Sequence, residues 1–111
     1  LIYLPKTIFQ NLSHLIQIDL SSNQIQSLES SIFDNLSNLN YLYLSKNRLN
    51  RVYLKNLSKF NVLDLAGNQF EIISDREQFK NMPIITSINL DNNTNLKNFL
   101  LDNIKILSVG L

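Results

Sequence analysis

One spacing pattern, Leu-x-x-Leu-x-Leu-x-x-Asn, occurs four times in these 111 residues and constrains the fold more than any other feature. Its defined positions are filled by Leu15, Ile18, Leu20 and Asn23; Leu39, Leu42, Leu44 and Asn47; Phe60, Leu63, Leu65 and Asn68; Ile85, Ile88, Leu90 and Asn93. Including a fifth start at Ile104, successive units begin 19 to 25 residues apart. Such a period is typical of solenoids, which present extended surfaces.

We therefore predict a single array of stacked repeats. Its boundaries are a partial repeat at 1–14, repeats at 15–38, 39–59, 60–84 and 85–103, and the start of another at 104–111. The Leu-x-Leu core has the period of two that a strand requires, so alternate residues point inward. Parallel strands stack at about 4.8 Å while the returning segments need more room, which places the strands on a concave side.

The asparagine that ends each pattern is predicted to form a structural ladder. Its members are Asn23, Asn47, Asn68 and Asn93. A buried amide offers both donors and an acceptor, so it can bond backbone groups that have left the sheet. A generic preference of asparagine for turns explains one occurrence, but not four in register.

A second column, Phe9, Phe33 and Phe79, marks the opposite side of the stack. The first full repeat, from Leu15 to Asn38, resembles the 24-residue leucine-rich repeat of animal extracellular proteins, such as Toll-like receptor ectodomains, small matrix proteoglycans and mosquito leucine-rich immune proteins. The resemblance implies an α/β solenoid: a right-handed leucine-rich repeat superhelix with a concave parallel β-sheet and an irregular or short-helical convex side. A capping box formed by Ser74 and Glu77 predicts a short convex helix.

The second and fourth repeats depart from the 24-residue form. The second has no phenylalanine in the convex column, so Leu54 and Leu57 are expected to fill that space. In the fourth, the apolar pair Leu96 and Phe99 arrives one residue late, which predicts a bulged turn near 92–95.

Composition and the two termini give only limited information about the cellular location of the protein. The net charge of +1 gives no overall attraction to nucleic acid or membranes. The absence of cysteine is weak support for a reducing compartment, because a core that runs from repeat to repeat does not need disulfides. No signal peptide or membrane span is visible. Both ends look cut, so we expect a fragment whose missing parts hold a signal peptide, cysteine caps and any membrane anchor.

Residues that could carry out catalysis are sparse. The single histidine, His14, falls in a predicted loop, and no glycine-rich phosphate loop is present. With one histidine and no cysteine, no metal site and no cofactor is expected. Asp19 and Asp64 occupy the same strand slot two strands apart, roughly 10 Å, but no cleft accompanies them. We predict that the protein is not an enzyme.

The outward strand positions are not part of the predicted core and are therefore candidates for contact with a partner. The predicted partner-binding residues are Gln17, Asp19, Tyr41, Tyr43, Lys46, Val62, Asp64 and Asn89. Tyr41 and Tyr43 stand out, because tyrosine combines rigid contact area with a polar tip and is enriched at binding hot spots. The alternative is that these two tyrosines only stabilise the sheet, because tyrosine pairs well with residues on neighbouring strands.

Two further surface features suggest extracellular partners. Basic residues run from Lys46 to Lys59 without an acidic residue, which fits either a solvated edge or an anionic glycan site, with nucleic acid the less favoured partner. Four Asn-x-Ser/Thr sequons make Asn11, Asn35, Asn56 and Asn92 glycosylation candidates, with Asn35 and Asn56 preferred. Three of these recur in one repeat column, so their number is weak support for secretion.

The leading hypothesis is a protein-binding module of a secreted protein or receptor ectodomain. The resemblance, rather than the periodicity, implies innate immune recognition. A structural or adhesive matrix component and an intracellular repeat scaffold stay open as alternatives, so an extracellular location is expected while an intracellular one is not excluded.

Overall fold

The computed structural model describes residues 3–74, 78–82, 84–100 and 105–110. The strands in these residues are β1 (Gln17–Asp19), β2 (Tyr41–Tyr43), β3 (Leu54–Lys55), β4 (Val62–Asp64), β5 (Ile72–Ser74), β6 (Phe79–Lys80), β7 (Ile84–Asn89), β8 (Asn98–Leu100) and β9 (Lys105–Gly110). No helix is found among them.

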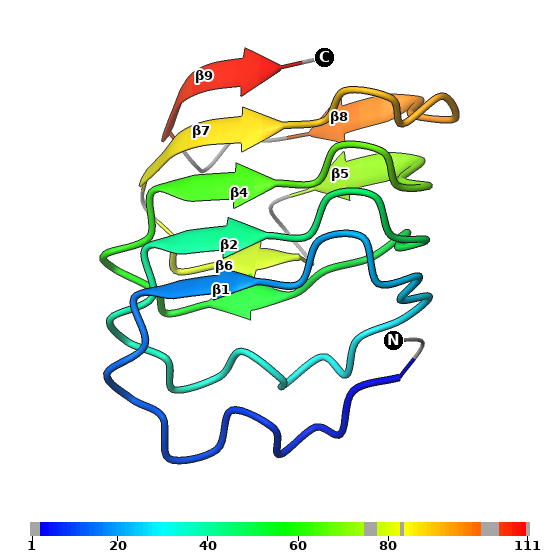
Figure 1. Ribbon diagram of the computed structural model, residues 1–111. Coiled ribbons are helices and arrows are strands. Elements are labelled where there is room, and N and C mark those ends of the chain that lie inside the picture. Colours follow the sequence, from blue (N-terminus) through cyan, green and yellow to red (C-terminus); the bar gives the residue numbers. More distant parts are fainter. Residues whose placement is uncertain (1–2, 75–77, 83, 101–104, 111) are drawn as a thin grey trace.

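Five strands form one parallel sheet in the order β1-β2-β4-β7-β9. Each comes from the Leu-x-Leu core of a repeat, and the register places Leu42 between Ile18 and Leu63. Figure 1 shows that each turn of the coil adds one strand to this sheet. The parallel-strand solenoid predicted from the sequence is therefore confirmed.

The core lies between the sheet and the returning segments. Leu42, Leu44, Leu63 and Leu65 are 0% exposed, whereas the strand residues between them keep contact with solvent. Burying each leucine contributes about 1.5–3 kcal/mol, so the alternation alone specifies which face of the sheet turns inward.

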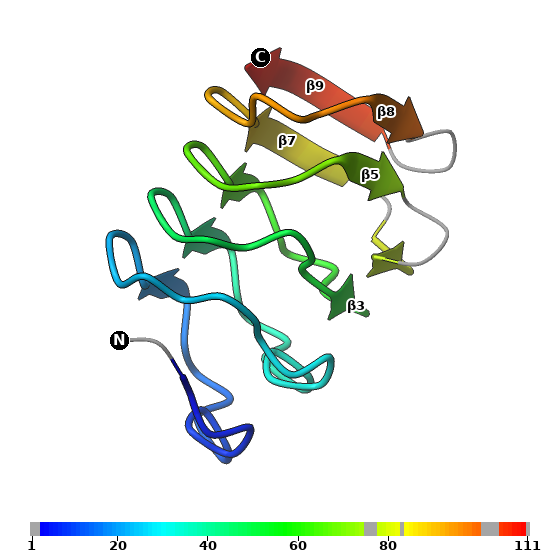
Figure 2. The same ribbon diagram turned by 90° about the vertical axis from the view of Figure 1, so that its right-hand side faces the viewer.

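The returning side of the coil contains short strand pairs instead of a helix. β3 pairs with β6 and β5 pairs with β8, both in parallel (Figure 2). The expected short convex helix is not found: Phe79 begins β6, and Glu77 of the proposed capping box lies outside the described residues. Phe79 and Lys80 instead pair in parallel with Leu54 and Lys55 of the preceding repeat.

The phenylalanine column is formed as predicted. Phe9 and Phe33 stack with ring centroids 6.0 Å apart, and Phe33 is 2% exposed. In the second repeat Leu54 takes the same position, paired with Phe79 and 2% exposed. A leucine therefore fills the space of the missing ring.

The fourth repeat contains the extra turn that its late apolar pair predicts. The Leu96 N–H donates to the Asn93 carbonyl at 3.0 Å, which inserts a turn directly after the asparagine. Ile73 then pairs with Phe99, one position later than in the regular spacing. The bulged turn is confirmed.

The register of the last strand differs from the predicted one. Alignment of Ile104 with Ile85 is wrong, because Ile106 is the residue paired with Ile85. Ile104 itself lies outside the described residues. A shift of two residues preserves the alternation of a strand, so hydrophobic pattern alone does not distinguish the two registers.

Candidate functional site

Seven of the eight predicted contact residues lie on one face of the five-stranded sheet. The first row across the strands consists of Gln17, Tyr41, Val62 and Ser87. The second row consists of Asp19, Tyr43, Asp64 and Asn89. These eight residues define what we call the outer face. Lys46, the remaining predicted residue, lies in the turn after β2.

The two tyrosines occupy the middle of the outer face. Both are half-buried on β2, with β1 on one side and β4 on the other, while Leu42 between them is fully buried. Gln17 and Asp19, on the edge strand β1, are exposed. The aromatic pair therefore retains accessible surface and is held on its strand by a well-packed core residue.

Three residues of the second row also shape the turn that follows their strands. Asp19 Oδ1 accepts the Ser21 N–H at 2.9 Å, and Asp64 Oδ1 accepts the Ala66 N–H at 3.1 Å. Asn89 Oδ1 forms the same contact with the Asp91 N–H at 3.0 Å. These are Asx turns, in which a short side chain mimics a backbone acceptor.

The turn contact also affects the charge of Asp19. Hydrogen bonds from the Ser21 backbone N–H and then from the Ser21 hydroxyl lower the pKa of Asp19 below its ordinary value of 3.8. Asp19 is therefore fully ionised at neutral pH, and its rotamer is held by the turn.

Lys46 belongs to a column of turn residues with left-handed backbone conformation. The column consists of Ser22 (φ 61°), Lys46 (φ 56°), Gly67 (φ 66°) and Asn92 (φ 59°). Glycine and asparagine adopt this conformation readily, whereas lysine pays a steric cost of about 1–2 kcal/mol. The turn geometry does not explain lysine at this position, and its side chain is exposed.

The pattern asparagines bond the backbone of two successive repeats. Asn47 Oδ1 accepts the N–H groups of Asn23 and Ile25, each at 3.0 Å. Its Nδ2 donates to the carbonyls of Leu20 and Leu44, also at 3.0 Å.

Asn68 and Asn93 repeat these contacts one repeat further along each time. Their Nδ2 atoms donate back to the Leu44 and Leu65 carbonyls, at 2.9 and 3.0 Å. Their Oδ1 atoms accept the N–H groups of Leu49 and Phe70, each at 3.0 Å. The ladder holds the turns in register and so positions the outer face.

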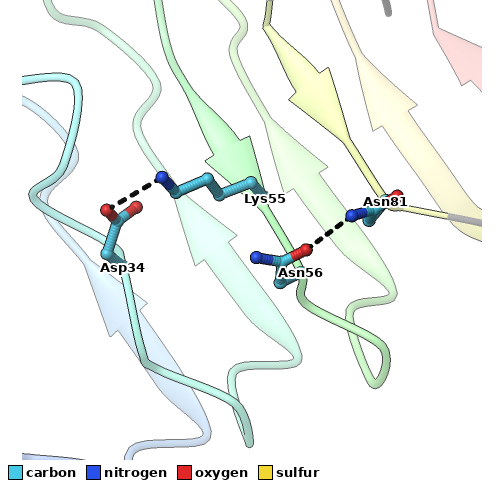
Figure 3. A network of polar contacts seen from close by, with 4 residues as sticks. All are labelled: Asp34, Lys55, Asn56 and Asn81. Atoms are coloured by element: carbon cyan, nitrogen blue, oxygen red, sulfur yellow. Dashed lines mark hydrogen bonds and ion pairs between the residues drawn. The ribbon is translucent and has the colours of Figure 1, made fainter.

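A second asparagine column lies on the returning side of the coil. Its members Asn11, Asn35, Asn56 and Asn81 have φ values of 67°, 66°, 59° and 54°. Asn81 Nδ2 donates to Asn56 Oδ1 at 2.8 Å (Figure 3). Because asparagine is one of the few residues that tolerate this conformation, backbone geometry accounts for three of the four sequons in this column and for the fourth, Asn92, in the column of Lys46. All four sequon asparagines are exposed.

A polar column at the entrance to the strands was not identified from the sequence. Asn61 Nδ2 donates to Asn40 Oδ1 at 2.6 Å, and the Thr86 hydroxyl donates to Asn61 Oδ1 at 3.0 Å. These side chains bridge β2, β4 and β7 at the edge of the outer face. The recurrence of a polar residue directly before the strand was the available signal, but the first repeat has Ile16 there.

The basic run from Lys46 to Lys59 does not form one surface. Lys55 lies on β3, away from the main sheet, and pairs with Asp34 at 3.4 Å (Figure 3). Lys59 Nζ donates to Asn38 Oδ1 at 2.9 Å. Arg51 lines a hollow of about 410 Å³ together with Glu71. The curvature of the coil distributes these charges around its circumference.

The described residues contain no helix of the length and apolarity that crossing a bilayer requires. They also contain no group of three or more histidine, cysteine or acidic residues arranged to hold a metal ion.

Comparison with known families gives one match. A family model described as "Leucine rich repeat" matches residues 1–49, and the same sheet register continues beyond that range through β4, β7 and β9. None of the curated proteins compared with the chain matches it.

Proposed function

We propose that this chain is a leucine-rich repeat protein and that it serves as a protein-binding module whose partner contacts the outer face. The leucine-rich repeat fold is typically a non-enzymatic scaffold for protein binding. The observation that carries the proposal is the position of Tyr41 and Tyr43, which are half-buried neighbours on the outer face of β2, a strand that is paired on both sides.

The rigidity of this tyrosine pair lowers the entropic cost of binding a partner. Leu42 is fully buried between the tyrosines, and both neighbouring strands are hydrogen-bonded to β2. Binding of a partner therefore costs little conformational entropy in the two tyrosine side chains. Aromatic anchors of this kind commonly contribute most of the binding energy of an interface. Charged side chains of Asp19 and Asp64 flank the pair and supply a polar rim.

Site-specific crosslinking tests which face binds. A photoreactive amino acid is placed at Tyr43, or at Lys80 on β6 of the opposite sheet as a control. Incubation with protein from the source tissue should give a crosslinked species from position 43 but not from position 80. Crosslinks from position 80 alone would place the binding surface on the returning side.

The identified partner then provides a quantitative test. The double substitution Tyr41→Ala and Tyr43→Ala should weaken binding by about tenfold or more, while the midpoint of unfolding changes little because neither ring is part of the core. Binding of unchanged affinity would refute a role for the outer face.

We further propose that the protein acts outside the cell, in a secreted protein or receptor ectodomain with a role in innate immune recognition. The support is the resemblance of its repeats to extracellular ones, together with sequon asparagines that are exposed. In Asn56 the oxygen accepts the bond from Asn81, so the nitrogen that would carry a glycan is not used in that contact.

Expression in a secreting animal host tests the extracellular proposal. Glycosidase treatment should lower the mass of the protein, and Asn35→Gln with Asn56→Gln should remove most of the shift. Asn81, which is exposed in the same column but is followed by Met82 and a proline, serves as an internal unmodified control. Absence of any mass shift would count against the proposal.

A further inference from the structure

One row of the outer face places an aromatic side chain between two carboxylates. The register pairs Tyr43 with Asp19 on one side and with Asp64 on the other. Each carboxylate-bearing residue is thus one strand spacing, about 4.8 Å, from the tyrosine. Asp91, exposed in the turn after β7, adds a further negative charge near this row.

Both carboxylates are fixed in position by the turns that follow their strands. In each, Oδ1 accepts a backbone N–H of the following turn, at 2.9 Å for Asp19 and 3.1 Å for Asp64. Among the described residues, neither Asp19 nor Asp64 has a salt-bridge partner within 4.0 Å. The ion pair found in these residues joins Lys55 and Asp34 instead. The Asp64 Oδ2 atom therefore remains available to an external donor, whereas the Asp19 carboxylate also accepts the Ser21 hydroxyl and offers its remaining acceptor capacity.

The turn contact alone does not require a negative charge. Asn89 occupies the same slot in the fourth repeat and forms the equivalent bond to the Asp91 N–H with a neutral amide. Tyr43 occupies the slot in the second repeat and has no side-chain acceptor for the turn at all. The charge of Asp19 and Asp64 and the ring of Tyr43 are therefore additional to what the fold needs.

We propose that Asp19, Tyr43 and Asp64 together bind an arginine side chain of the protein partner. The inference rests on the proposed function and specifies the chemistry of the partner. A cation over an aromatic ring gains electrostatic energy from the ring, and carboxylates on both sides add charge-assisted hydrogen bonds.

Arginine fits this row better than lysine. Its guanidinium is planar and presents five N–H donors in one plane, so it stacks on a ring while donating outward to both sides. The ammonium of lysine is a compact, strongly hydrated charge, which suits a single carboxylate better than two residues roughly 10 Å apart.

The experiment uses a defined peptide as the probe. A glycine- and serine-rich peptide with two arginines is titrated into the isotope-labelled full chain, and a second peptide carries citrulline in place of arginine. Citrulline has nearly the same shape but no charge. The arginine peptide should shift the Tyr43 resonances and bind about tenfold more tightly than the citrulline peptide.

Variants that preserve the turns isolate the contribution of charge. Asp19→Asn with Asp64→Asn keeps the turn acceptors, as Asn89 demonstrates, and should weaken arginine-peptide binding about tenfold. Glu29→Gln with Glu71→Gln removes the same net charge from exposed positions outside the row and should leave the affinity unchanged. Tyr43→Leu should weaken binding about threefold by removing the ring.

Three results would overturn the inference. These are equal affinity for the two peptides, unchanged affinity in the asparagine variant, and an equal loss in the glutamine control, which would indicate only net charge. If the arginine peptide fails but the crosslinked partner still depends on Tyr41 and Tyr43, the arginine assignment is wrong and the outer face remains the binding surface. If the partner is also insensitive, the proposed function is wrong as well.

Discussion

Replacing Asn47 by alanine tests the asparagine ladder directly. Asn47 is 6% exposed, and its Oδ1 accepts the N–H groups of Ile25, which is 0% exposed, and of the half-buried Asn23. Alanine removes both acceptors. The carbonyls of Leu20 and Leu44 lose one donor each but keep another, from Asn23 and Asn68 respectively.

The expected cost follows from this unequal loss. An unpaired buried N–H costs about 1–3 kcal/mol, and the half-buried one belongs at the low end of that range. Carbonyls that keep a second donor add little. We therefore expect Asn47→Ala to lower the free energy of unfolding by about 3 kcal/mol.

Asn23→Ala is the matched comparison within the same ladder. The Asn23 side chain donates to the Leu20 and Ser21 carbonyls, but its Oδ1 accepts no bond from the described residues. Its removal leaves no backbone N–H of the described residues unpaired, so the expected loss is about 1 kcal/mol or less. Equilibrium urea unfolding of both variants measures the difference. Equal losses would refute the argument that acceptance of backbone N–H groups is the main contribution.

The remaining predictions concern the left-handed column, the Asx turn and the ion pair. Asn56→Ala should lower the free energy of unfolding by about 1 kcal/mol and Asn56→Gly should be nearly neutral in urea unfolding, because φ is 59°. The lowered folded-state pKa of Asp19 stabilises the fold above the ordinary value of 3.8, and this contribution is lost as pH falls through the folded pKa. Asp19→Asn should therefore reduce the acid-induced drop in melting temperature, and an unaltered pH profile would contradict the assignment. Lys55→Gln should change stability by less than about 1 kcal/mol, because the pair with Asp34 is at the surface.

Several parts of the fold were predictable because the sequence pattern that specifies them occurs in every repeat. The buried leucine columns follow from the period of two, and Leu42 and Leu63 take the expected inward positions. Asn47 and Asn68 could be assigned to a shared structural role because the same residue recurs in register. The position of Tyr41 and Tyr43 on the outer face followed by exclusion from these columns.

Other parts depend on contacts between repeats that no single repeat displays. Asn11, Asn35 and Asn56 of the returning column are visible in the sequence only as sequons, because a left-handed φ is a backbone property without its own sequence pattern. The bridge from Asn61 to Asn40 and Thr86 requires the register of three strands.

The sequence by itself determined the repeat, the columns of buried residues and the positions that face solvent. The reason is that the periodicity is a local pattern that recurs in every repeat. Only the tertiary structure decided that β3 and β6 pair where a helix was expected, and that Ile106 rather than Ile104 follows Ile85 in the sheet. It also decided that Asp19, Tyr43 and Asp64 form one row. The physical reason is that hydrogen bonds between repeats select the register, and alternation leaves registers two residues apart equally acceptable.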